Sequence, residues 1–107
     1  MATVVTNTGK AISANRKHGT GSEPVYVGWG TGAGTAAATD TTLFTEASEA
    51  RVAGTASVVT TTNTNDTWQV VGTLTASAGK TITNAGNFDA STSGNLDVKG
   101  DFTGIAL

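Results

Sequence analysis

Residues 49–77 read EARVAGTASVVTTTNTNDTWQVVGTLTAS and carry the clearest secondary-structure signal in the chain. Two runs rich in valine and threonine, whose branched side chains suit a pleated sheet, flank a polar turn at residues 63–66. In the second run Trp68, Val70 and Leu74 share one face of the strand. This period of two is typical of a half-buried antiparallel strand. The pattern predicts a long hairpin that holds the core, with Trp68 buried.

Turn-forming residues divide the rest of the chain into short elements. We expect strands over residues 2–6, 25–29, 50–62, 67–76, 81–88 and 95–107. The sequence therefore predicts one all-β domain over residues 1–107. Its expected form is an antiparallel β-sandwich or partly open barrel of about six strands with one short N-terminal helix.

The expected helix covers residues 9–17, and Asn7 or Thr8 is placed to cap it. A single turn over the residues that follow Asp40 is expected to tuck Leu43 or Phe44 under the sheet. Both elements would bring apolar side chains of the first half of the chain onto the strands.

The last two strands have distinct patterns. Gly86 lies within the strand over residues 81–88 and indicates a bulge or a close backbone contact. In the final strand Leu96, Val98 and Phe102 are in phase, and Gly100 lies in the same phase where a small residue is needed.

Small and uncharged residues dominate the composition. Of the 107 residues, 22 are threonine and 14 are glycine, hydrophobic residues make up 37%, and charged residues only 13%. Such a chain builds a thin core, and small domains with thin cores are often completed by oligomerisation. Low charge also reduces the desolvation cost of a permanent interface.

Several classes of partner lack the residues that they require. The net charge is −2 and the one basic cluster is Arg16-Lys17-His18, so nucleic-acid binding is not expected. The chain has no cysteine and no apolar run long enough for a membrane span. Its first residues lack the basic and apolar regions of a secretion signal. We therefore expect a protein that is made in a cytoplasm and has neither nucleic-acid nor membrane partners.

No set of residues indicates catalysis, a metal or a cofactor. The glycines of residues 28–34 lack the following Lys-Ser/Thr and helix of a phosphate-binding loop. His18 is the only histidine, and the aspartates of residues 89–101 lack calcium-type spacing. Trp29 and Trp68 could form a sugar-stacking platform, but each is in phase with apolar neighbours, which favours core packing. We expect no enzyme.

Several stretches resemble a known group of proteins. They are Val4-Val5-Thr6-Asn7-Thr8-Gly9 leading into residues 11–16, Val25-Tyr26-Val27-Gly28-Trp29-Gly30-Thr31-Gly32, Ala38-Thr39-Asp40-Thr41-Thr42-Leu43, and Ile82-Thr83-Asn84-Ala85-Gly86-Asn87-Phe88-Asp89-Ala90. Together with the threonine-rich hairpin, they resemble small tailed-phage virion proteins: head decoration (cement) proteins and tail-collar or tail-fibre modules. The family carries an acidic residue and an aliphatic one where this chain has Asn84 and Asn87. It also tends to continue with another strand past the position of Leu107.

The resemblance implies a capsid decoration protein that binds and stabilises the coat-protein lattice without catalysis. The implied partner is the major capsid protein, and the implied location is the capsid surface of a virion assembled in the host cytoplasm. The alternatives are a tail-collar or tail-fibre component and, from the tryptophans alone, a carbohydrate-binding module. We also expect a homo-oligomer, a trimer by analogy with the three-fold sites of coat lattices. Its interface is expected to include Phe102, Ile105 and Leu107.

Overall fold

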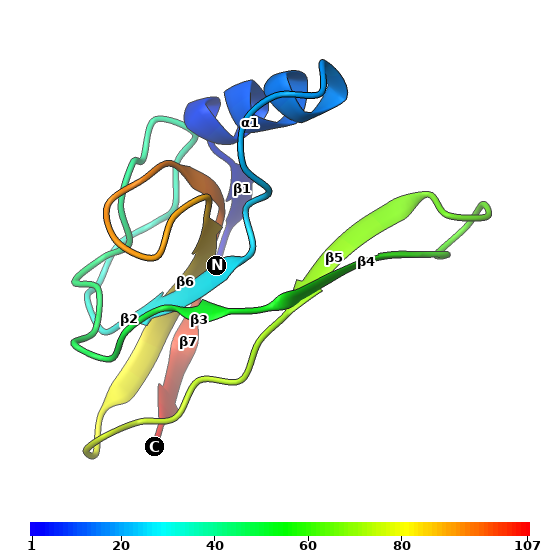
Figure 1. Cartoon of the computed structure of the whole chain (residues 1–107). Coiled ribbons are helices and arrows are strands. Elements are labelled where there is room, and N and C mark those ends of the chain that lie inside the picture. Colours follow the sequence, from blue (N-terminus) through cyan, green and yellow to red (C-terminus); the bar gives the residue numbers. More distant parts are fainter.

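The computed structural model describes all residues from 1 to 107 and contains seven strands and one helix (Figure 1). The elements are β1 (Thr3–Val5), α1 (Asn7–Lys17), β2 (Tyr26–Gly30), β3 (Val52–Ala53), β4 (Thr55–Val59), β5 (Thr67–Val71), β6 (Thr81–Phe88) and β7 (Leu96–Ala106). Five strands form an antiparallel sheet in the order β1-β7-β6-β2-β3, and β4 and β5 form a separate two-stranded ribbon. The prediction of an all-β antiparallel fold with one short N-terminal helix is confirmed.

Strands β6 and β7 form the centre of the sheet. β6 pairs with β2 on one side and with β7 on the other. The pairing of β6 with β7 shifts register between Gly86 and Phe88, and again between Ile82 and Asn84. The irregularity that the sequence predicts at Gly86 is therefore present.

One face of the sheet is covered by residues 31–51, which we name the covering loop. The loop approaches closely because the strands beneath it carry glycine. A Cβ atom on Gly30 would lie 2.4 Å from the Phe44 carbonyl oxygen, and one on Gly86 would lie 3.1 Å from a Leu43 methyl group. Leu43 is buried with Phe88 and Leu96 in the apolar core, as expected for Leu43, although residues 41–44 form no helical turn.

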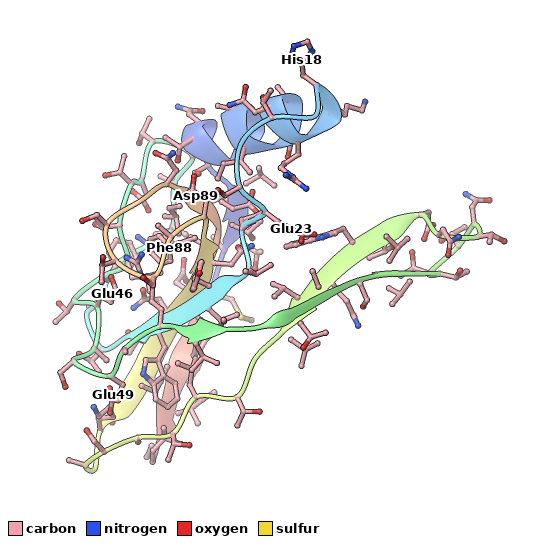
Figure 2. All side chains as sticks on the ribbon, in the orientation of Figure 1. His18, Glu23, Glu46, Glu49, Phe88 and Asp89 are labelled. Atoms are coloured by element: carbon pink, nitrogen blue, oxygen red, sulfur yellow. The ribbon has the colours of Figure 1, made fainter.

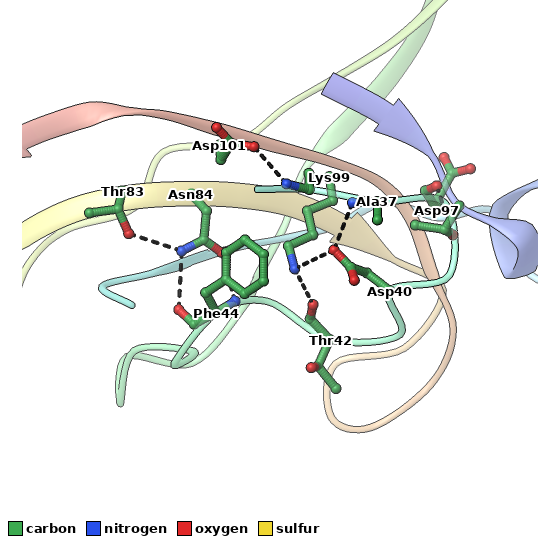
Figure 3. Close-up of polar contacts among 11 residues, drawn as sticks. Ala37, Asp40, Thr42, Phe44, Thr83, Asn84, Asp97, Lys99 and Asp101 are labelled. Atoms are coloured by element: carbon green, nitrogen blue, oxygen red, sulfur yellow. Dashed lines mark hydrogen bonds and ion pairs between the residues drawn. The ribbon is translucent and has the colours of Figure 1, made fainter. Parts of the chain in front are cut away.

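A buried lysine fastens the covering loop to β7 (Figure 3). The Lys99 side chain is only 1% exposed, and its Nζ donates to Asp40 Oδ2 at 2.9 Å and to the Thr42 carbonyl oxygen at 2.8 Å. The ammonium also lies 3.2 Å from the centre of the Phe44 ring, a favourable cation–π distance. Hydrogen bonds from the Ala37 N–H and from Lys99 lower the pKa of Asp40. The Asp40 carboxylate therefore stays ionised at neutral pH.

Two more buried polar side chains hold the same loop. Asn84 accepts from the Phe44 N–H at 3.0 Å and donates to the Phe44 carbonyl at 3.1 Å, as a strand neighbour would (Figure 3). Asp101 accepts from the Ala36 N–H at 2.7 Å, and this bond is the main reason that its pKa is lowered. Each bond pairs a backbone group that the loop would otherwise bury without a partner.

Arg51 closes the far end of the covering loop. Its guanidinium pairs with Glu46 at 2.7 Å, donates to the carbonyl oxygens of Ala90 and Ser93, and lies 3.4 Å from the centre of the Phe88 ring. The loop is thus attached at both ends and at its middle.

The apolar phase of the last strand is not its more buried face. Asp97, Lys99 and Asp101 are the buried residues of β7 beyond Leu96, whereas Val98 and Phe102 are only half-buried. The covering loop supplies partners for Lys99 and Asp101, and Asn87 of β6 donates to Asp97.

Helix α1 begins at Asn7, earlier than predicted, because neither Asn7 nor Thr8 is the capping residue. Thr6 is the N-cap, and its hydroxyl accepts from the Gly9 N–H at 3.0 Å. The same hydroxyl donates to the Leu96 carbonyl at 2.6 Å, so the cap also fixes the helix on the end of β7. A Cβ on Gly9 would lie 2.2 Å from the Asp97 carbonyl oxygen, which shows how closely the two elements approach.

Glu49 joins three segments that are distant in the sequence. Its carboxylate accepts from the Ser77 N–H at 2.8 Å, from Lys80 Nζ, and from the Trp29 indole N–H at 3.4 Å. The Lys80 and Ser77 bonds lower the pKa of Glu49 to about 2. Glu49 thus fixes the segment that leads from β5 back to β6.

The first prediction concerns Lys99. Replacing Lys99 with Met should lower the free energy of unfolding by about 3 kcal/mol, because Asp40 and the Thr42 carbonyl lose their partner. This loss is at the lower end of the range measured when one partner of a buried ion pair is removed. The reason is that the Asp40 side chain is 22% exposed, so water can solvate the carboxylate that has lost its partner. Urea unfolding of Lys99→Met beside Lys10→Met, whose lysine is exposed, measures the difference. Equal losses in the two variants would contradict the account.

The second prediction concerns acid stability. The pKa of Glu49 falls from 4.5 to about 2 on folding, so its carboxylate stabilises the fold above pH 4.5, and that contribution disappears as the pH falls toward 2. Glu49→Gln should therefore lose less stability than the wild type across this interval. Thermal melting at a series of pH values tests this, and parallel curves for the two proteins would show that the contact contributes nothing.

Candidate functional site

The β4–β5 ribbon and its connecting turn project away from the sheet, and we name residues 55–71 the arm (Figure 1). The break falls at Gly54, between β3 and β4, where a Cβ atom would lie 2.6 Å from a Val70 methyl group. The prediction that this hairpin holds the core is wrong. Its first run starts in the sheet as β3, and the rest leaves the sheet as the arm.

The two faces of the arm differ in polarity. The pairs Ala56–Val70 and Val58–Trp68 form an apolar face, which we name the inner face. The opposite, outer face is mostly polar and is formed by Thr55, Ser57, Val59, Thr67, Gln69 and Val71. On the inner face Val58 is 57% exposed and Trp68 is 39% exposed, so the burial predicted for Trp68 is wrong. The alternation correctly identifies the two faces, but no part of the sheet lies against the inner one.

The tip of the arm is held by its only charged residue. Asp66 accepts from the backbone N–H groups of Thr61, Thr62 and Asn63 at 2.9, 3.0 and 2.9 Å. These bonds lower the pKa of Asp66, and Asn65 adopts the left-handed conformation at φ 56°. The tip is therefore an ordered turn with a permanent negative charge.

A groove of about 550 Å³ separates the arm from α1. Trp68 lines the arm side, and its indole N–H donates to Glu23 Oε2 at 2.9 Å. The remaining lining residues are Ile12, Ser13, Arg16 and Lys17 of α1, together with Glu23, Pro24 and Asp97. The groove thus has a basic helical wall and an aromatic wall on the arm.

Asp97 is a buried carboxyl group at this groove. It is 6% exposed, and Asn87 Nδ2 donates to its Oδ2 at 3.0 Å. Burial raises the pKa of Asp97, because the Asn87 bond only partly offsets the loss of water. Asn87 also donates to the Pro24 carbonyl at 2.9 Å, so the pair anchors the loop at the base of the groove.

The predicted interface residues lie at the other end of the molecule, on the C-terminal strand. Ile105 and Leu107 are each 54% exposed, and Phe102 is half-buried. β1 pairs with β7 only at Val98, Lys99 and Gly100, so the part of β7 beyond Asp101 has no strand on that side. These residues are accessible to a partner, but they do not line the groove.

The other motifs noted in the sequence lie outside the groove. His18 points outward at the end of α1, away from the labelled carboxylates (Figure 2). No group of three His, Cys, Asp or Glu residues is placed to hold a metal ion. Gly28 and Gly30 lie within β2, where the covering loop packs on them. No helix is long and apolar enough to cross a membrane.

The groove itself could not be found from the sequence. Its residues come from four separate segments, and only the Arg16-Lys17 part was noticeable as a basic cluster. No local pattern connects Trp68 with Glu23 or Ile12.

Comparisons with known proteins found no relative. No family model matches the chain, and neither a curated protein nor a solved structure is significantly similar to it.

The third prediction concerns Trp68. Because the side chain is 39% exposed, Trp68→Ala should lower the free energy of unfolding by only about 1 kcal/mol, not by the 3–5 kcal/mol typical of a buried aromatic residue. Leu96→Ala, a truncation in the buried core, is expected to cost more. Denaturant unfolding compares them, and a Trp68→Ala variant that is the less stable of the two would contradict the exposed position.

Proposed function

We propose that this chain is a structural protein of a tailed-phage virion that binds the outer surface of the capsid and stabilises the coat-protein lattice without catalysis. The observation that carries the proposal is the arm: a ribbon with one charge and an exposed apolar face, projecting from a firmly anchored body. Such an element suits contact with neighbouring subunits of a protein lattice through buried area and backbone pairing. The resemblance of the sequence to phage decoration proteins supports the same conclusion.

The proposed partners are the major capsid protein and further copies of the chain. We propose a homotrimer whose contacts include Phe102, Ile105 and Leu107. Exposed apolar side chains beside a strand edge that has no partner support an interface there. Low charge supports it too, since a total of 14 charged side chains gives little repulsion between copies.

Two alternatives to capsid decoration predict different experimental results. A tail-collar or tail-fibre component would be present in a handful of copies at the tail. A carbohydrate-binding module gains some support from Trp68, whose exposed ring lines the groove beside Glu23 and Arg16.

The direct test is to count the chain in purified particles of the phage that encodes it, by quantitative mass spectrometry of separated heads and tails. Decoration predicts hundreds of copies on the heads. A few copies confined to the tails would favour the fibre alternative, and binding of the isolated protein to a glycan array would favour the carbohydrate module.

The fourth prediction concerns the C-terminal strand. Ile105→Asp should weaken self-association at least tenfold, because it places a charge in the proposed apolar contact. Val71→Asp is a matched control, since Val71 is 60% exposed on the outer face of the arm. Sedimentation equilibrium measures both. Equal association constants for the two variants would remove Ile105 from the interface.

A further inference from the structure

We propose that the inner face of the arm binds the inner face of a second copy of this chain, so that the two arms cross beside the grooves. This surface is distinct from the C-terminal strand, and the inference does not depend on where the assembly is located.

The first argument is that the arm is incomplete alone. Two-stranded ribbons are marginally stable in water, and stability requires further strands or an apolar surface to pack on. The chain supplies little of this, because a groove of about 550 Å³ separates the arm from α1 and the one side-chain hydrogen bond between arm and body joins Trp68 to Glu23. Val58 and Trp68 consequently remain 57% and 39% exposed on the inner face. A partner surface would complete the packing.

The second argument is that the charges favour a second arm as that partner. No charged residue occurs in residues 52–65 or 67–79, so two arms have almost nothing to repel each other. The one exception is the tip carboxylate of Asp66, and the helical wall of the groove carries Arg16 and Lys17. The groove also contains the carboxyl groups of Glu23 and Asp97, which accept from the neutral Trp68 indole and Asn87 amide. An arm whose single charge lies at its tip therefore adds little repulsion to a contact made by its inner face.

The third argument is the shape of the inner face. Its largest side chain, Trp68, and its smallest, Ala56, lie on diagonal positions of two adjacent pairs. A two-fold axis along the other diagonal, through Val58 and Val70, places each Trp68 over the Ala56 of the other copy. It also places Val58 against Val58. The ribbons then cross at a steep angle, which is one of the two usual ways that sheets pack. Isologous contacts require such self-complementarity.

The experiment compares two valines of the same arm that differ only in face. Val58 is 57% exposed on the inner face and Val71 is 60% exposed on the outer face. The chain has no cysteine, so single variants Val58→Cys and Val71→Cys report directly on contacts between copies. Under mild oxidation Val58→Cys should form a disulfide-linked dimer much faster than Val71→Cys. Sedimentation of Val58→Asp should show association weakened at least tenfold, because two carboxylates meet, whereas Val71→Asp should associate as the wild type does.

Equal crosslinking of the two cysteine variants, equal association of the two aspartate variants, or a wild-type chain that is monomeric at all concentrations would overturn the inference. Circular dichroism of each variant confirms that the fold is retained. These measurements use the isolated protein, so they test this inference separately from the capsid proposal. A chain that self-associates through the arm but is absent from virions would refute only the capsid proposal.

Discussion

The buried ammonium of Lys99 is the contact on which the body of this protein depends. It joins β7 to the covering loop through Asp40, the Thr42 carbonyl and the Phe44 ring. The sheet needs this attachment because the apolar core is small and contains only six buried hydrophobic residues. Asn84, Asp101 and Arg51 hold the same loop, and every buried side-chain polar atom has a hydrogen-bond partner. Paired polar groups thus contribute much of the stabilisation that an apolar core supplies in a larger protein.

The division between body and arm follows from where these attachments end. Glu49 and Arg51 fix the chain just before β3, and Lys80 meets Glu49 again after the arm. Between β3 and Ser77 the one side-chain hydrogen bond from the chain to the body is that of Trp68 with Glu23, and the arm extends from the sheet (Figure 1). A rigid body with a weakly supported ribbon is suited to binding through that ribbon, since local stability is lowest where contacts are fewest.

The sequence predicted the strands well and their environment poorly. Alternation located β5, β6 and β7 and the two faces of the arm, and Gly86 marked an irregularity that the structure contains. Alternation does not reveal which face will be covered. Lys99 and Asp101 became interior residues because an irregular loop, which has no periodicity of its own, supplies their partners. Trp68 stays partly exposed because it faces a groove and not the sheet, and a groove built from separate segments leaves no local signal in the sequence.

Native-state hydrogen exchange of the isolated protein tests the central claim most directly, because it reports the stability of each hydrogen bond separately. The account predicts that the amides of Ala36 and Phe44, which donate to Asp101 and Asn84, exchange as slowly as those of β6 and β7. It predicts that the amides of β4 and β5 exchange much faster at low protein concentration and become protected as the concentration rises. Fast exchange at Ala36 and Phe44, or protection of the arm that does not depend on concentration, would contradict it.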